Sequence, residues 1–311
     1  MIQYDDGIYA IDTEYVRPKL DASHLIVEDG RAAFVDTGTN YSVPLLLEAL
    51  ASIDMDVGDV DYVILTHIHL DHAGGAGLLM QHLPNAKCAV HPRGARHIAS
   101  PEKLIAGTEA VYGVEQTRRM YGEIQPIDEA RLLVPDDDQL IDLNGRPLRV
   151  LYTLGHAKHH YCLHDARSNS VFTGDSFGIS YREFDTANGA FIYPTTTPIH
   201  FDPPEAHKAV DRIMGLAPDQ VFLTHYSRVT GLDRLAADLH TTIDDFVTMA
   251  TQYATDAART KRIQGAMFEY LAARLATHGY GGDRDDMYEL LEPDLLLNTQ
   301  GLEFWLDHVE H

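Results

Sequence analysis

The densest group of residues that could do chemistry lies between positions 66 and 75. The segment reads Thr-His-Ile-His-Leu-Asp-His-Ala-Gly-Gly and contains His67, His69, Asp71 and His72. Neutral imidazole and carboxylate are ligands suited to Zn²⁺ or Fe²⁺. Residues two apart in an extended chain point the same way, so His67 and His69 can hold one ion. A turn into a following helix would bring Asp71 and His72 to a second position beside the first.

Three further candidate ligands each follow an apolar segment that we predict to be a strand. His156 comes after Leu-Tyr-Thr-Leu-Gly, Asp175 after Val-Phe-Thr-Gly, and His225 after Val-Phe-Leu-Thr. Strand ends that meet at one edge of a sheet can assemble a site from distant parts of a chain. We therefore predict two divalent metal ions ~3.5–4 Å apart. Zinc is the expected metal, with iron or manganese as alternatives, because these ligands accept several metals.

The elements that must position these residues alternate between strands and helices up to about residue 232. A hairpin is predicted at 140–150 around an Asn-Gly turn, and a proline- and aromatic-rich loop occupies 176–204. The other predicted strands are 7–12, 24–27, 32–36, 61–65, 87–91, 161–164, 170–173 and 220–224, and the predicted helices lie near 43–50, 73–83, 102–123 and 205–216.

From residue 233 onward the pattern becomes helical. Apolar residues between 235 and 250 repeat at spacings of three and four, which is the period of an amphipathic helix. A second such set spans 263–275. Two shorter helices are predicted at 288–297 and 302–309.

Composition restricts the classes of partner. Lys and Arg number 24 against 47 Asp and Glu, a net charge of −23, and such a field repels nucleic acid and anionic membranes. The sequence shows no secretory signal and no apolar stretch long enough to span a bilayer. Cys88 and Cys162 are too few for a disulfide framework or a cysteine zinc cage. We expect a cytoplasmic protein with a small-molecule substrate and no nucleic-acid or membrane partner, and a homodimer stays open.

The motif set resembles that of the metallo-β-lactamase superfamily in order and spacing, over about residues 7–230. The resemblance implies an α/β fold, the four-layered αββα metallo-β-lactamase sandwich with a C-terminal helical extension. We therefore predict a catalytic domain at 1–232 and a helical extension at 233–311 that covers the active site. The matching positions are His67-x-His69-x-Asp71-His72, Gly155-His156, Gly174-Asp175 and Thr224-His225.

By this resemblance the candidate ligands divide into two sets. One metal ion would be bound by His67, His69 and His156. The other would be bound by Asp71, His72 and His225. Asp175 would bridge the two ions.

Two more residues match positions that support the ligands in the family. Asp36 lies in a Val-Asp-Thr-Gly motif, which implies a place beside the ligands, with an ordinary turn aspartate as the alternative. His160 matches a second histidine that follows the Gly-His motif in many members, and we expect it to pack or to support a ligand. His159 is expected to be a solvated neighbour.

The chemistry implied is hydrolysis by a hydroxide that bridges the two metal ions. Coordination lowers the pKa of water from 15.7 to about 7, so hydroxide exists at neutral pH. It would attack a carbonyl carbon or a phosphorus atom. Asp71, beside this nucleophile, is the predicted catalytic residue that orients it and moves its proton.

Departures from known branches narrow the reaction. Antibiotic-hydrolysing members have Cys or Ser where Asp175 stands, and flavodiiron members have Glu where His69 stands. The helical tail is similar to that of glyoxalase II and of a thioesterase, which favours a thioester, ester or lactone substrate. A phosphodiesterase, and a metal-bound regulatory or partner-binding protein with little turnover, remain alternatives.

The aromatic residues after the bridging position are predicted to form the substrate pocket. We assign Phe177, Tyr181 and Tyr193 to its wall, together with Tyr226. Aromatic residues in a long loop could equally form a minor core or a dimer contact.

Overall fold

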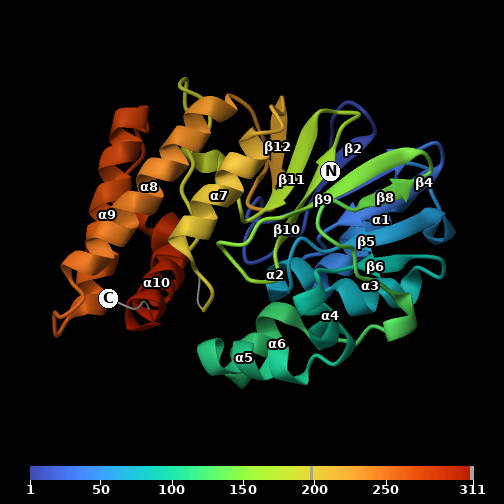
Figure 1. Cartoon of the computed structure of the whole chain (residues 1–311), viewed down its shortest axis with the longest axis horizontal. Coiled ribbons are helices and arrows are strands. Elements are labelled where there is room, and N and C mark those ends of the chain that lie inside the picture. Colours follow the sequence, from blue (N-terminus) through green and yellow to red (C-terminus); the bar gives the residue numbers. More distant parts are fainter. Residues whose placement is uncertain (197–198, 309–311) are drawn as a thin grey trace. The chain divides into compact units, whose positions relative to one another are not determined.

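A computed structural model describes residues 1–196 and 199–308, which fall into two compact units (Figure 1). The second unit includes the loop after residue 174 as well as the C-terminal helices, and the boundary predicted at residue 232 stays a prediction. The first unit consists of Met1–Tyr152, His159–Gly174 and Gln220–Arg228, and the second of Thr153–Lys158, Asp175–Asp219 and Val229–His311.

The first unit contains a seven-stranded sheet whose strands lie side by side in sequence order. Its first four strands pair antiparallel, and the fourth to seventh pair parallel. The turn between the third and fourth strands is the Asp29-Gly30 pair. The strands are β1 (Ile2–Gln3), β2 (Ile8–Asp12), β3 (Ala22–Glu28), β4 (Arg31–Val35), β5 (Val60–Ile64), β6 (Lys87–Ala89) and β7 (Leu132–Leu133).

A six-stranded sheet in the same unit has the order β13-β12-β11-β10-β9-β8. The predicted Asn-Gly hairpin joins β8 to β9, and β11 pairs parallel with β12. The strands are β8 (Leu140–Leu143), β9 (Arg146–Tyr152), β10 (Tyr161–Asp165), β11 (Ser170–Gly174), β12 (Gln220–Leu223) and β13 (Ser227–Val229).

Six α-helices belong to the first unit. The helix predicted at 73–83 is α3, which a short helix α2 precedes, and the helix predicted at 102–123 is divided at Gly113. The helices are α1 (Val43–Ala51), α2 (Leu70–Ala73), α3 (Ala76–His82), α4 (Pro92–Ala99), α5 (Glu102–Tyr112) and α6 (Val114–Tyr121).

The strand β4 shows how the layers of this unit are held together. Successive side chains of a strand point to opposite faces. Ala33 packs with Phe172 in a core between the two sheets. Phe34 packs with Leu46 of α1 and Leu79 of α3 in a core on the other face. Because both faces of β4 are buried, its sequence reads as a continuous apolar run, and burying a side chain such as Phe34 contributes about 1.5–3 kcal/mol.

Among its described residues, the second unit contains four long helices, drawn in yellow to red in Figure 1. The last is one continuous helix, which corrects the prediction of two shorter pieces; position 309 lies outside the described residues. Its buried residues Leu291, Leu295, Asn298 and Leu302 follow one another at spacings of four and three, so a single apolar face continues past Pro293. The helices are α7 (Pro203–Met214), α8 (Leu232–Gln252), α9 (Arg259–His278) and α10 (Arg284–His308).

The two sheets and the C-terminal helices form the predicted mixed α/β architecture. Within the described residues, every helix is too short or too polar to cross a bilayer.

Candidate metal centre

The histidine-rich segment after β5 gathers its imidazoles in the first unit. His69 has an extended backbone as the last residue before α2. His67 Nε2 lies 2.9 Å from His69 Nδ1, and the ring centroids of His67 and His72 are 4.0 Å apart. Gly75 donates its N–H to Gly38 O at 2.8 Å, and a Cβ on Gly75 would lie 2.6 Å from Thr39 O. The backbones therefore approach each other closely at this glycine.

Asp71, His72 and His225 converge on one point of the first unit, with one ligand atom of each within 4.8 Å of the others. Asp71 Oδ2 is 3.6 Å from His72 Nε2 and 3.5 Å from His225 Nε2. Two ligands ~2.0–2.1 Å from a tetrahedral zinc ion are about 3.4 Å from each other. These separations, and the imidazole and carboxylate donors, fit a divalent transition metal ion.

The Asp36 carboxylate binds the ring nitrogen of His72 that does not face Asp71. His72 Nδ1 donates to Asp36 Oδ2 at 2.8 Å. The same carboxylate accepts hydrogen bonds from the Thr66 backbone N–H and hydroxyl and from the Thr224 hydroxyl, all at 2.8 Å. Because an ionised carboxylate only accepts, His72 carries its proton on Nδ1 and presents Nε2 as a lone pair toward Asp71. The structure thus places Asp36 beside a candidate ligand rather than in an isolated turn.

Asp21 does the same for His225, and sequence reasoning missed it. Asp21 is fully buried, and its Oδ1 lies 2.6 Å from His225 Nδ1. Burial raises the pKa of the Asp21 carboxyl to about 6, an effect that His225 opposes. Ala22 donates its N–H to Thr224 O at 2.8 Å, which brings the start of β3 beside the residue that precedes His225. The residues around Asp21 form no sequence motif from which this contact could be predicted.

Two neighbouring histidines lie against His67. The ring of His160 stacks on it at 4.9 Å and that of His159 lies parallel to it at 6.1 Å. His159 is only 9% exposed, so the expectation of a solvated side chain was wrong. Both histidines lie at the end of the loop that precedes β10, and both belong to the first unit.

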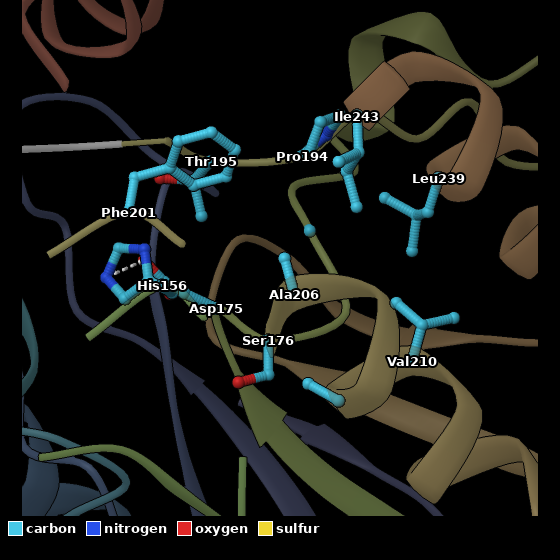
Figure 2. A pocket seen from close by; sticks show the side chains of 12 residues that line it. His156, Asp175, Ser176, Pro194, Thr195, Phe201, Ala206, Val210, Leu239 and Ile243 are labelled. Carbon is cyan, nitrogen blue, oxygen red and sulfur yellow. Dashed lines mark ion pairs between the residues drawn. The ribbon is translucent and has the colours of Figure 1, made fainter. Parts of the chain in front are cut away.

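His156 and Asp175 come together in the second unit. Both are buried, and His156 Nε2 lies 3.4 Å from Asp175 Oδ2. They line one side of a cavity of about 20 Å³, with Val210, Leu239 and Ile243 across from them (Figure 2). That volume holds about one water molecule. The cavity beside this pair of candidate ligands is therefore small and lined mainly by apolar side chains.

The four predicted pocket residues are all buried. The hydroxyls of Tyr181 and Tyr193 both donate to Asp294 Oδ2 of α10, at 2.9 and 2.8 Å. Phe177 is fully buried in the same unit, and Tyr226 packs near Ala10, Ala22 and Tyr4 in the first unit. The pocket role of these residues stays a prediction.

Comparison with known proteins agrees with this architecture. The family model of the metallo-beta-lactamase superfamily matches residues 17–226. A metallo-beta-lactamase fold-containing protein of Sulfurisphaera tokodaii is 28% identical over 225 residues, which cover 70% of this chain and 78% of that protein. The acyl-coenzyme A thioesterase MBLAC2 of Gallus gallus is 30% identical over 124 residues, 36% of this chain and 40% of that protein. The chain thus spans less than half of that thioesterase.

A solved structure covers nearly the whole chain. The crystal structure of an archaeal metallo-beta-lactamase superfamily protein from Sulfolobus tokodaii aligns with a TM-score of 0.66 at 22% identity, over 96% of this chain and 99% of that one. At this identity the likeness concerns the fold, with its two sheets and C-terminal helices. Since the family model matches well over half of its residues, this chain belongs to the metallo-beta-lactamase superfamily.

Proposed function

We propose that this protein is a dinuclear metal-dependent hydrolase that acts on an acyl thioester, with an ester or lactone as chemically related substrates. The observation that carries the proposal is the convergence of Asp71, His72 and His225, in which each imidazole is held by a buried carboxylate. One ion would be held by His67, His69 and His156, the other by Asp71, His72 and His225, and Asp175 would be shared.

The choice of a thioester is supported by the relatives. One of them is named an acyl-coenzyme A thioesterase, and another, from Aspergillus chevalieri, an atrochrysone carboxyl ACP thioesterase. This chain spans 40% and 39% of these two proteins, so the substrate class is carried over as part of the proposal. Aspartate at position 175, where antibiotic-hydrolysing members have Cys or Ser, supports an acyl substrate other than a β-lactam.

Asp71 is the residue that we assign to proton transfer. When bound, the metal ions would supply a Lewis acid and acidify a water molecule. The Asp71 side chain is 23% exposed, against 0% for His72 and 8% for His225. Its carboxylate is therefore the most accessible group of the three. It would accept a proton from the attacking water and return it to the departing thiolate as the carbon–sulfur bond breaks.

A substrate panel tests this proposal. Purified protein is assayed with acyl-coenzyme A thioesters, lactones and bis-p-nitrophenyl phosphate, alongside Asp71→Asn. We expect thioester turnover, lowered by about 10²–10⁴-fold in Asp71→Asn because general acid–base catalysis is lost. Asp54→Asn, at an exposed aspartate of the same unit, is the matched control and should keep full activity.

Two outcomes would contradict the proposal. Turnover of the phosphodiester alone would identify a phosphodiesterase. If protein with its metal bound turned over none of the substrates, a regulatory role would be indicated instead.

A further inference from the structure

A second group of metal-ligating side chains lies on α7 and α8, within the second unit. His207 and Asp211 are four residues apart on α7, and His240 and Asp244 are four residues apart on α8. Residues at this spacing share one face of a helix. None of the four belongs to the seven ligands of the candidate metal centre, so this site is independent of the proposed function.

The two imidazoles meet head to head. His207 Nδ1 and His240 Nδ1 are 2.7 Å apart, the ring centroids are 5.0 Å apart, and the ring planes differ by 9°. Near-parallel rings with nitrogens this close direct their Nδ1 atoms at each other. Both imidazoles are partly exposed, at 27% and 32% of the side chain, so water can reach them.

The opposite nitrogen of each ring contacts a carboxylate on the other helix. His207 Nε2 is 3.1 Å from Asp244 Oδ1, and His240 Nε2 is 3.2 Å from Asp211 Oδ1. An ionised carboxylate only accepts hydrogen bonds, so His207 carries a proton on Nε2, and the Asp211 carboxylate beside His240 favours the same tautomer there. Both Nδ1 atoms are then lone-pair donors that face each other. Two lone pairs at this separation repel, and a proton or a metal ion between them would remove the repulsion.

We propose that His207 and His240 form a second metal site, which binds a divalent transition metal ion such as Zn²⁺ or Cu²⁺ through their Nδ1 atoms. Imidazole nitrogen is a preferred ligand of both metals. Asp244 and Asp211 fix the tautomer and orientation of the rings, as carboxylates do behind many metal-binding histidines. Two nitrogens on one tetrahedral ion lie about 3.4 Å apart, so the rings must separate by about 0.7 Å. Water would complete the coordination.

The competing occupant is a single shared proton, and a metal count distinguishes the two. Chelator-treated full-length protein is titrated with Zn²⁺ alone, dialysed, and analysed for metal by mass spectrometry. We expect the double variant His207→Gln, His240→Gln to bind one equivalent fewer than the wild type. His97→Gln, at a partly exposed histidine of α4, should bind the wild-type number.

A second variant protects the test against a folding defect in the first. Asp211→Asn, Asp244→Asn keeps both imidazoles but weakens their orientation. We expect about 10–100-fold weaker Zn²⁺ binding at this site only. Equal zinc counts and equal affinities in the wild type and both double variants would overturn the proposal and leave the shared proton as the occupant. Because the seven ligands of the candidate metal centre are unchanged, thioester turnover reports separately on the proposed function.

Discussion

At the scale of single residues, the candidate metal centre depends on carboxylates that contact the Nδ1 atoms of its histidines. Asp36 binds His72 Nδ1 and Asp21 lies against His225 Nδ1, so both imidazoles direct Nε2 toward Asp71. Such partners fix the ring orientation and raise ligand basicity. The ligands are therefore oriented before any ion binds, which reduces the rotamer entropy that binding must remove.

The contribution of Asp21 can be measured with one isosteric change. We expect Asp21→Asn to weaken metal binding by about 10–100-fold, because the neutral amide is a poorer acceptor for His225. Chelator competition at equilibrium measures this affinity. Asp29→Asn, in the exposed turn before β4, should bind metal as the wild type does. Equal affinities for wild type and Asp21→Asn would show that Asp21 does not position His225.

Sequence alone could predict residues that form a local pattern. His67, His69, Asp71 and His72 are dense enough to be recognised, and the structure gathers them in one unit. Asp21 could not be predicted, because only the pairing of β3 with residue 224 brings it to the site. Burial of a side chain such as His159 likewise depends on tertiary packing.

At the scale of elements, the spacing of apolar residues predicted where strands and helices lie better than it predicted where a helix is broken. The stretch 102–123 was predicted as one helix, whereas the structure divides it at Gly113, which has φ +83°. A glycine with a positive φ can end a helix without changing the apolar spacing on either side. The reverse error occurred in α10, where two helices were predicted at 288–297 and 302–309 but the buried face is continuous.

Two glycines, one within α5 and one between α5 and α6, should respond in opposite ways to replacement by alanine. Gly107 is exposed within α5, so Gly107→Ala should stabilise the protein by about 0.5–1 kcal/mol. Gly113 has open space around it but a positive φ, so Gly113→Ala should destabilise by about 1–2 kcal/mol. Urea unfolding measures both changes. A stabilising effect of Gly113→Ala would show that the break between α5 and α6 is absent in solution.

At the scale of the whole molecule, the stability of the first unit should depend on a histidine outside the candidate metal centre. His24 is 1% exposed and its ring packs edge-on against Phe172 and Phe222 between the two sheets. Burial lowers the pKa of His24 from 6.5 to about 4. The neutral form is therefore favoured in the folded state.

The pH dependence follows from this lowered pKa. The unfolded chain binds a proton at His24 below pH 6.5, and the folded chain does so only near pH 4. The free energy of unfolding should fall by about 3 kcal/mol as the pH drops through this interval. His24→Leu should make that dependence shallower, with the part due to His91, whose pKa burial also lowers to about 4, remaining. His82→Gln, at an exposed histidine of α3, should keep the full dependence. Parallel curves for wild type and His24→Leu would contradict the prediction.

The whole-molecule architecture was largely predictable, since alternating strands and helices followed by a helical tail reflect apolar periodicity. The grouping of residues 175–219 with the C-terminal helices was not, because it depends on long-range packing. The substrate class is likewise a property of the assembled site.

If bound metal ions enable acyl hydrolysis, the rate must follow the metal content of the protein, and a metal titration of activity measures this. Chelator-treated protein is supplied with Zn²⁺ in steps while the rate of acyl-thioester hydrolysis is recorded. We expect negligible turnover without metal and a rate that rises with Zn²⁺ until the two ions proposed for the candidate metal centre are bound. A rate that is unchanged by chelation and by added Zn²⁺ would contradict it.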